Sequence, residues 1–114
     1  MIIINKRNNL TLAKNVKLAD SFYDRLMGVM FIKEMKGMDA LLLSPSNSIH
    51  NFFVRFAIDV VFIDKKNRVV KIIREFKPWR MTRIYFTAVK VLELPAGKLI
   101  DDIDVGDELE VRYV

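Results

Sequence analysis

Short stretches of the chain alternate between apolar and polar residues, the pattern of β-strands that bury one face. The alternation is clearest at residues 69–76, which follow the apolar run at residues 58–63 after a polar turn. These two segments predict a β-hairpin. Residues 10–12 and 16–18 suit a second, shorter hairpin or meander. Further strands are predicted at residues 2–4, 40–43, 49–54, 88–94 and 109–113.

One short helix is predicted near the N-terminus, with Asp20 or Ser21 as its N-cap. Apolar residues then recur at spacings of three and four, which places them on one helix face: Phe22, Leu26, Val29 and Met30. Residues 99–103 predict a helical turn at most. Seven or eight short strands with one helix are typical of a mainly β domain. We expect a small antiparallel β-barrel or sandwich with one short N-terminal helix, formed as a single domain by residues 1–114.

Composition excludes several classes of function. The chain has no cysteine, so disulfides, thiolate metal sites and a cysteine nucleophile are absent, and one histidine cannot build a histidine zinc site. We therefore expect no metal and no cofactor. The N-terminal residues lack the order of a signal peptide, and no window approaches the roughly 20 apolar residues of a membrane span. These features predict a cytoplasmic protein that does not bind membranes, and they leave its oligomeric state open.

The net charge of +5 is unevenly distributed along the chain. Nine basic residues lie between Lys65 and Lys90 against Glu75 alone, whereas residues 101–110 contain six acidic residues and no basic one. Such asymmetry can indicate an anionic partner. The simpler interpretation, which we favour, is that the two blocks are solvated faces that attract one another in the folded protein.

The sharpest candidate site is the stretch from Ser48 to Asp64. It contains the only histidine, an arginine between aromatic residues and a carboxylate inside an apolar run. That carboxylate, Asp59, must be hydrogen-bonded or paired if it is buried, because an isolated buried charge is very costly. It could bind a polar ligand or act as a base. Its structural alternatives are to cap a turn or to pair with Arg55 or Arg25.

Glu93 presents the same alternatives, an inward carboxylate in a pocket or one end of a salt bridge. If Arg55, Asp59 and Glu93 share one face, they form a polar cluster within an apolar rim, as in ligand pockets. The leading hypothesis is therefore a non-enzymatic module that binds a small polar or anionic ligand. The residues predicted to bind it are His50, Asn51, Arg55, Asp59 and Glu93.

A second hypothesis places nucleic acid on the basic, aromatic surface from Lys71 to Phe86. Aromatic rings stack on bases while arginines contact phosphates. The candidate residues are Arg74, Lys77, Trp79, Arg80 and Arg83. The structural alternative is a loop in which Trp79 and Phe86 close one end of the fold while the arginines remain in water.

A third hypothesis is a hydrolase or lyase that uses His50 as its acid or base. No serine lies in a nucleophile-elbow sequence, and the serines at positions 44, 46 and 48 suit turns. The four glycines are isolated and form no phosphate-binding loop. These observations favour a non-enzymatic protein and leave the third hypothesis open.

Four motifs occur in order along the chain, at residues 25–30, 52–62, 91–97 (VLELPAG) and 105–107. Together they resemble the family known as domain of unknown function 192, found in bacteria and archaea, over about residues 10–112. In that family the run before the aspartate usually reads Met-(Lys or Arg)-x-x-Pro-Leu-Asp. Here Val54 replaces the methionine, Ala57 replaces the proline, and Val29 stands where leucine is usual. The resemblance implies a compact, mostly antiparallel β-fold with a short helix near the N-terminus, and it implies no activity.

Overall fold

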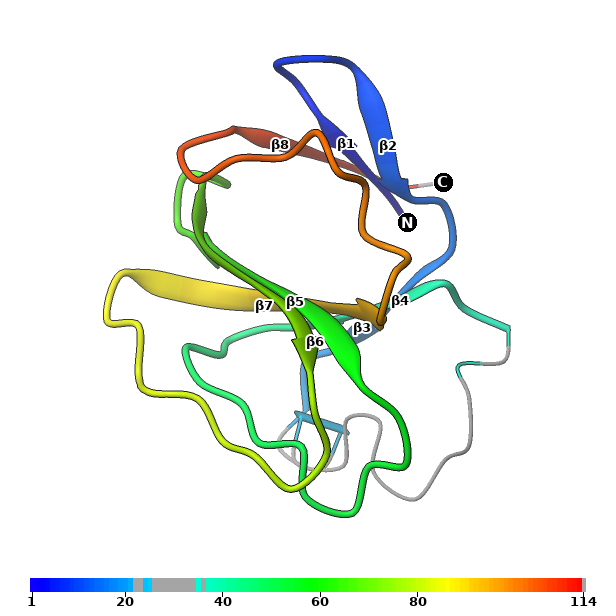
Figure 1. Ribbon diagram of the computed structural model, residues 1–114. Coiled ribbons are helices and arrows are strands. Elements are labelled where there is room, and N and C mark those ends of the chain that lie inside the picture. Colours follow the sequence, from blue (N-terminus) through cyan, green and yellow to red (C-terminus); the bar gives the residue numbers. More distant parts are fainter. Residues whose placement is uncertain (22–23, 26–34, 36, 114) are drawn as a thin grey trace.

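The computed structural model describes residues 1–21, 24–25, 35 and 37–113, which form two β-sheets (Figure 1). The first sheet is antiparallel, in the order β2–β1–β8, with bounds β1 Ile2–Asn5, β2 Leu10–Ala13 and β8 Leu109–Arg112. The second sheet has the order β3–β4–β7–β5–β6. Its bounds are β3 Val16–Ala19, β4 Ala40–Leu43, β5 Ile58–Asp64, β6 Val69–Phe76 and β7 Ala88–Pro95. The predicted mainly β fold is confirmed.

The predicted hairpin β5–β6 and the strand β7 form the middle of the five-stranded sheet. Val61 of β5 lies opposite Ile72 of β6 and Leu92 of β7. Val61 belongs to the core between the two sheets, whereas its neighbour Val60 belongs to a second core on the other face. Because β5 is buried on both faces, its sequence is a continuous apolar run rather than an alternation.

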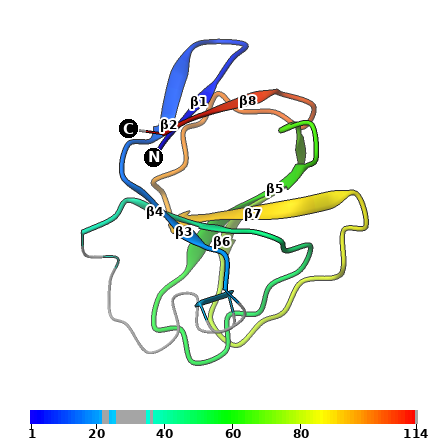
Figure 2. The ribbon, with the colours of Figure 1, turned by 180° about the vertical axis from the view of Figure 1, so that it is seen from behind.

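The turn of the β5–β6 hairpin connects the two sheets. The backbone N–H of Val69 donates to the C=O of Asp107 (2.8 Å), and the N–H of Leu109 donates to the C=O of Asn67 (2.7 Å). Figures 1 and 2 show the hairpin bending away from β7 toward β8, so the sheets enclose one core in a barrel-like arrangement. Residues 99–103, predicted as a helical turn at most, belong to the loop that leads from β7 to β8.

Strands β2 and β3 do not pair with each other, contrary to the expected hairpin. Strand β2 pairs with β1, whereas β3 runs parallel to β4, with Val16 opposite Ala40. Between them, the backbone N–H groups of Lys14 and Asn15 donate to the carboxylate of Asp39 (2.7 and 2.8 Å). This turn carries the chain from one sheet to the other, and the five-stranded sheet therefore includes one parallel pair.

Residues 49–54, predicted as a strand, form an irregular loop instead. Phe53 has a left-handed backbone (φ 61°), which strand geometry does not allow. The N–H of Asn51 donates to the C=O of Arg80 (2.7 Å), and the C=O of Asn51 accepts from the N–H of Trp79 (2.9 Å). The segment is rich in apolar residues because it covers the second core, and its backbone pairs with another loop rather than with the sheet.

The predicted N-terminal helix falls mainly on residues 22–23 and 26–30, which lie outside the described residues. Asp24 and Arg25 are helical, and the Oγ of Ser21 accepts a hydrogen bond from the N–H of Asp24 (3.0 Å), as an N-cap does. No longer helix occurs in the described part of the chain.

The acidic block binds basic residues near the N-terminus. Arg7 donates to Asp107 (Nε to Oδ1, 2.8 Å) and to Asp102 (Nη2 to Oδ1, 2.7 Å). Lys6 forms an ion pair with Glu108. No side-chain ion pair joins the two charge blocks among the described residues. The blocks nevertheless meet where Arg68 lies opposite Glu108, and the hydrogen bond from Lys6 together with the positive charge of Arg68 lowers the pKa of the Glu108 carboxyl. The attraction expected between the blocks is therefore present at this contact.

The Asp107 carboxylate should make stability depend on acidity. Hydrogen bonds from Arg7, from the N–H of Asp104 and from Asn5 hold the pKa of Asp107 at about 2, below its ordinary value of 3.8. Stability from a depressed carboxyl pKa is present above the ordinary value and is lost as the pH falls through the folded-state value. We expect Arg7→Gln to lower the urea midpoint at pH 7 and to have little effect near pH 2.

Urea unfolding at both pH values measures this difference. Arg112→Gln is the matched control, because Arg112 is exposed and its ion pair is with Glu110. An equal loss of stability at both pH values in Arg7→Gln would contradict the assignment to Asp107.

Candidate functional site

Asp59 lies in β5, and its buried carboxylate is bound by three backbone donors. Its Oδ1 accepts from the N–H of Glu75 (3.0 Å), and its Oδ2 accepts from the N–H groups of Gly97 (3.0 Å) and Leu99 (3.1 Å). These bonds hold the turn after β7, and a left-handed residue of β6 (Glu75, φ 54°), against β5. Asp59 therefore caps a turn, one of the structural roles considered from the sequence.

Glu93 in β7 is buried as deeply but lacks such partners. Its side chain is 3% exposed, and its Oε2 has no hydrogen-bond partner. Its neighbours across the sheet are Leu41 and Val60. Burial among apolar side chains raises the pKa of the Glu93 carboxyl to about 8. Burial therefore favours the protonated form of this carboxyl group, which forms no salt bridge with any described residue.

Asp59 and Glu93 point to opposite faces of the five-stranded sheet. Asp59 lies opposite Leu94, and Glu93 lies opposite Val60. Because successive residues of a strand face opposite sides, Asp59 faces the core between the sheets and Glu93 faces the second core. One pocket cannot contain both carboxyl groups.

Arg55 approaches neither carboxyl group. It is exposed in the loop between β4 and β5, and it takes part in none of the hydrogen bonds or ion pairs of the described residues. Arg25, the other partner considered for Asp59, donates instead to the C=O of Asp20 (2.7 Å). The arginine–carboxylate pairs suggested by the sequence do not form.

His50 and Asn51 occupy the loop that precedes β5. The imidazole of His50 stacks on Phe52 at a centroid distance of 5.1 Å, and its Nδ1 accepts from the N–H of Phe52 (3.3 Å). The buried amide of Asn51 donates to the C=O of Phe76 (3.0 Å), while its Oδ1 has no partner. No hydrogen bond joins His50 to a carboxylate or hydroxyl within the described part of the chain.

The residues of the predicted ligand site, His50, Asn51, Arg55, Asp59 and Glu93, therefore do not lie together in the structure. Three of its residues lie in one loop, and its two carboxyl groups lie within the sheet on opposite faces. The sequence identified residues in unusual environments, but the shared pocket expected from them is not formed.

A different group of residues gathers where two long loops, residues 50–57 and 77–87, meet at one end of the five-stranded sheet (Figure 1). The rings of Phe53 and Trp79 pack edge to face at 4.8 Å, yet they remain 48% and 61% exposed. Phe86 is also exposed (85%), but it precedes the start of β7, which lies beside Asp64 at the opposite end of β5 from Trp79. We call the exposed aromatic and basic residues of these loops, Phe86 excepted, the loop-end surface: Phe53, Arg55, Lys77, Trp79, Arg80 and Arg83.

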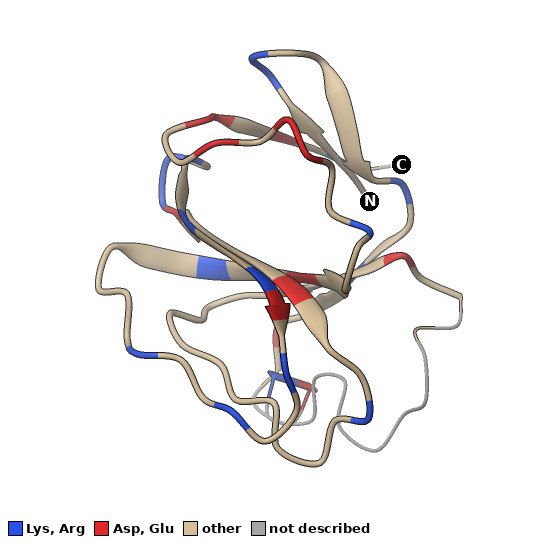
Figure 3. Ribbon diagram, in the orientation of Figure 1, with Lys and Arg blue, Asp and Glu red and all other residues tan. Residues whose placement is uncertain are grey.

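The loop-end surface carries basic residues without acidic ones. Neither loop contains aspartate or glutamate, and Figure 3 shows only basic positions along both loops. The four basic side chains form no ion pair with any described residue. Arg83 lies over the ring of Tyr85 (5.4 Å from guanidinium carbon to centroid). This end of the molecule is therefore both cationic and aromatic.

Backbone contacts between the loops position Trp79. Its left-handed conformation (φ 65°) is uncommon for a bulky residue and is held by the hydrogen bond from its N–H to Asn51 (2.9 Å). Asn51 is anchored in turn to β6 through Phe76. The backbone and the side-chain amide of Asn51 thus position the loop-end surface.

Arg74 is the one residue of the predicted nucleic-acid-binding set that has a structural role instead. Its guanidinium donates to the C=O groups of Leu99 (3.2 Å) and Ile100 (2.7 Å). The sequence missed Phe53 as a member of the surface and assigned Arg55 to the other site. The sequence shows that Phe53 and Arg55 have aromatic neighbours. Their proximity to Trp79 arises only because the two loops pair in the folded protein.

The described residues contain neither a group of metal ligands nor a membrane-spanning helix. Among them, no three histidine or acidic side chains are grouped closely enough to hold a metal ion. No helix in the same residues is long and apolar enough to span a membrane.

Fold and site together define a small two-sheet β domain with buried structural carboxyl groups and one exposed basic, aromatic end. The family model DUF192, described as Uncharacterized ACR, COG1430, matches residues 2–111, and the chain belongs to this family. It is 36% identical over 99 residues to the UPF0127 protein PH1112 of Pyrococcus horikoshii, covering 84% of this chain and 85% of that protein. It is also 36% identical over 113 residues to a UPF0127 protein of Thermococcus gammatolerans, covering 93% and 71% of the two chains.

Two crystal structures share the fold. One, from Sinorhizobium meliloti and described as a "putative transcription regulator", has a TM-score of 0.77 at 22% identity and covers 96% of this chain and 89% of that one. The other, a protein of unknown function from Novosphingobium aromaticivorans, has a TM-score of 0.72 at 16% identity and covers 97% and 93%. These similarities establish the fold alone.

Proposed function

We propose that this protein is a non-enzymatic module that binds single-stranded nucleic acid through the loop-end surface. The observation that carries the proposal is the exposed pair of Phe53 and Trp79 among four basic side chains without acidic partners. Exposed aromatic rings stack on bases, with about 1–3 kcal/mol per base, while arginines and lysines contact phosphates.

The geometry of the surface favours a single strand over a duplex. Its aromatic rings project from irregular loops, and the described residues offer no helix that could enter a major groove. Base faces are open to stacking only where the strand is unpaired. A positively charged surface alone would bind any polyanion. Exposed aromatic rings add stacking contacts, which require the bases of a nucleic acid.

The other two functions considered from the sequence have weaker support. A pocket near the stretch from Ser48 to Asp64 requires the convergence of residues that the structure separates. Hydrolysis or elimination at His50 requires a partner group, and the hydrogen bond of its Nδ1 leads only to a backbone N–H.

Intrinsic fluorescence tests the proposal directly, because Trp79 is the only tryptophan. We expect a single-stranded oligothymidylate to quench this fluorescence on binding. An abasic oligonucleotide of the same length should bind much more weakly, because it offers phosphates but no bases. Equal binding of the two would indicate a general polyanion site and would contradict base stacking.

Substitutions should separate the two kinds of contact. We expect Trp79→Ala, measured by anisotropy of a labelled oligonucleotide, to weaken binding about fivefold or more without changing its salt dependence. Arg80→Gln and Arg83→Gln should each reduce the slope of log affinity against log salt by about 0.7. Tyr113→Ala is the matched aromatic control, because Tyr113 is 78% exposed in the C-terminal segment. Affinity unchanged in all three surface variants would overturn the proposal.

A further inference from the structure

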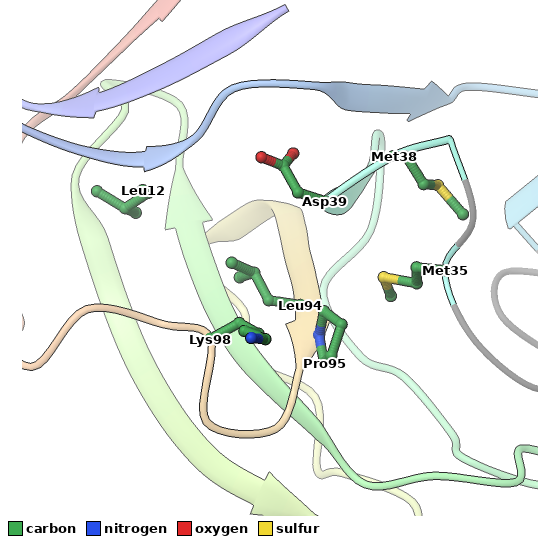
Figure 4. A pocket seen from close by; sticks show the side chains of 7 residues that line it. All are labelled: Leu12, Met35, Met38, Asp39, Leu94, Pro95 and Lys98. Atoms are coloured by element: carbon green, nitrogen blue, oxygen red, sulfur yellow. The ribbon is translucent and has the colours of Figure 1, made fainter.

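A cavity of about 330 Å³ lies at the C-terminal end of β7, and no residue of the loop-end surface lines it. Leu94 and Pro95 form its floor. Leu12 lies on one side, and Met35 and Met38 lie on the opposite side (Figure 4). The lining is thus mainly apolar, and unbranched methionine side chains can adapt to the shape of a ligand. Small-molecule sites typically combine such a lining with a few polar groups.

Two charged residues border the cavity, and they differ in their hydrogen bonds. The carboxylate of Asp39 turns toward β2 and β3, where it accepts the backbone N–H groups of Lys14 and Asn15 (Figure 4). Lys98 lies across the cavity, and its ammonium group has no partner among the described residues. Among the described residues of the lining, Lys98 is therefore the polar side chain that remains available to a ligand.

Three hydrogen bonds hold the backbone on either side of Lys98 and at Lys98 itself. Asp59 binds the N–H groups of both its neighbours, Gly97 (3.0 Å) and Leu99 (3.1 Å), and the N–H of Lys98 donates to Pro95 (3.0 Å). The buried carboxylate thus fixes the base of the lysine side chain at the mouth of the cavity. Such preorganisation lowers the cost of ordering a binding group.

We propose that this cavity binds a small carboxylic acid with an apolar chain or ring, whose carboxylate pairs with the ammonium group of Lys98. The volume suits roughly ten non-hydrogen atoms, taking about 30 Å³ for each as for water. An apolar body of that size fills the space between Leu12, Leu94 and the two methionines. The site is independent of the loop-end surface and would stand if nucleic-acid binding were disproved.

Octanoate is the probe, with 1-octanol and octylamine as neutral and cationic analogues of the same chain length. In two-dimensional amide NMR of the full chain, monomeric octanoate should shift the signals of Gly97, Leu99 and Asp39. Octanol should bind about tenfold more weakly, because a charge-assisted hydrogen bond is lost. Octylamine should bind more weakly still, because its charge is repelled by Lys98.

Two variants test the assignment to this cavity. Lys98→Gln should weaken octanoate binding by about tenfold while leaving octanol binding unchanged. Lys66→Gln, an exposed lysine in the β5–β6 turn, is the matched control and should change neither. Met38→Trp should abolish binding of both by filling the cavity. The proposal is overturned if octanoate shifts none of the three signals, if octanol binds as tightly as octanoate, or if Lys98→Gln binds octanoate as the unaltered chain does.

Discussion

Replacing Asp59 by alanine is expected to lower the free energy of unfolding by about 4 kcal/mol, because it leaves three buried or half-buried backbone N–H groups without their acceptor. For a domain of this length, such a loss corresponds to a fall in melting temperature of roughly 15 °C. Urea and thermal unfolding measure both quantities. Asp101→Asn is the matched control, since Asp101 is exposed and forms no hydrogen bond through its side chain among the described residues.

A graded series makes the Asp59 prediction sharper. Asp59→Asn keeps one acceptor oxygen but directs an NH₂ group at a backbone donor, so its loss should be intermediate, about 2–3 kcal/mol. Hydrogen exchange should also accelerate at the amides of Glu75, Gly97 and Leu99 by more than the global loss of stability explains. A loss below about 1 kcal/mol in Asp59→Ala would show that the three hydrogen bonds do not anchor the turn.

The sequence around Asp59 predicts that its carboxylate needs hydrogen-bond donors, but it does not identify them. A carboxylate inside an apolar run must find donors, and a turn cap was among the roles considered. The donors themselves could not be predicted, because they lie 16, 38 and 40 residues further along the chain. Only the pairing of β5 with β6 and β7 brings those amides to the carboxylate.

The failure of the predicted pocket has a geometric cause. Whether Asp59 and Glu93 share a face depends on the register of β5 against β7, and a shift of one residue would place them together. The alternation within each strand was visible in the sequence, but the register between strands 30 residues apart was not. The observed register sets Asp59 opposite Leu94 and so separates the two carboxyl groups.

The loops account for the remaining differences. Residues 49–54 are as apolar as a buried strand because they cover the second core, so composition could not distinguish the two. The left-handed conformations of Phe53 and Trp79 are imposed by hydrogen bonds between loops rather than by local preference. The basic and aromatic residues of the nucleic-acid hypothesis are close together in the sequence, whereas their arrangement into one surface depends on these contacts.

Glu93 is expected to make the protein progressively less stable as the pH rises from about 4.5 to about 8. Burial raises its folded-state pKa to about 8, above the ordinary value of 4.5, so the folded protein binds this proton more tightly than the unfolded chain does. The stability linked to the proton is fully present below the ordinary pKa and is lost as the pH rises through the folded-state pKa. Each pH unit in this window should cost up to about 1.4 kcal/mol.

Glu93→Gln should remove this dependence, because glutamine resembles the protonated carboxyl group at every pH. We expect the variant to match the unaltered protein near pH 4.5 and to exceed it in stability by several kcal/mol at pH 9, in urea unfolding at a series of pH values. Glu75→Gln is the control, since the Glu75 side chain is exposed and should show no such divergence. Parallel stability curves for Glu93→Gln and the unaltered chain across the window would show that Glu93 is ionised in the folded state, and hence that a polar partner or water reaches it within the second core.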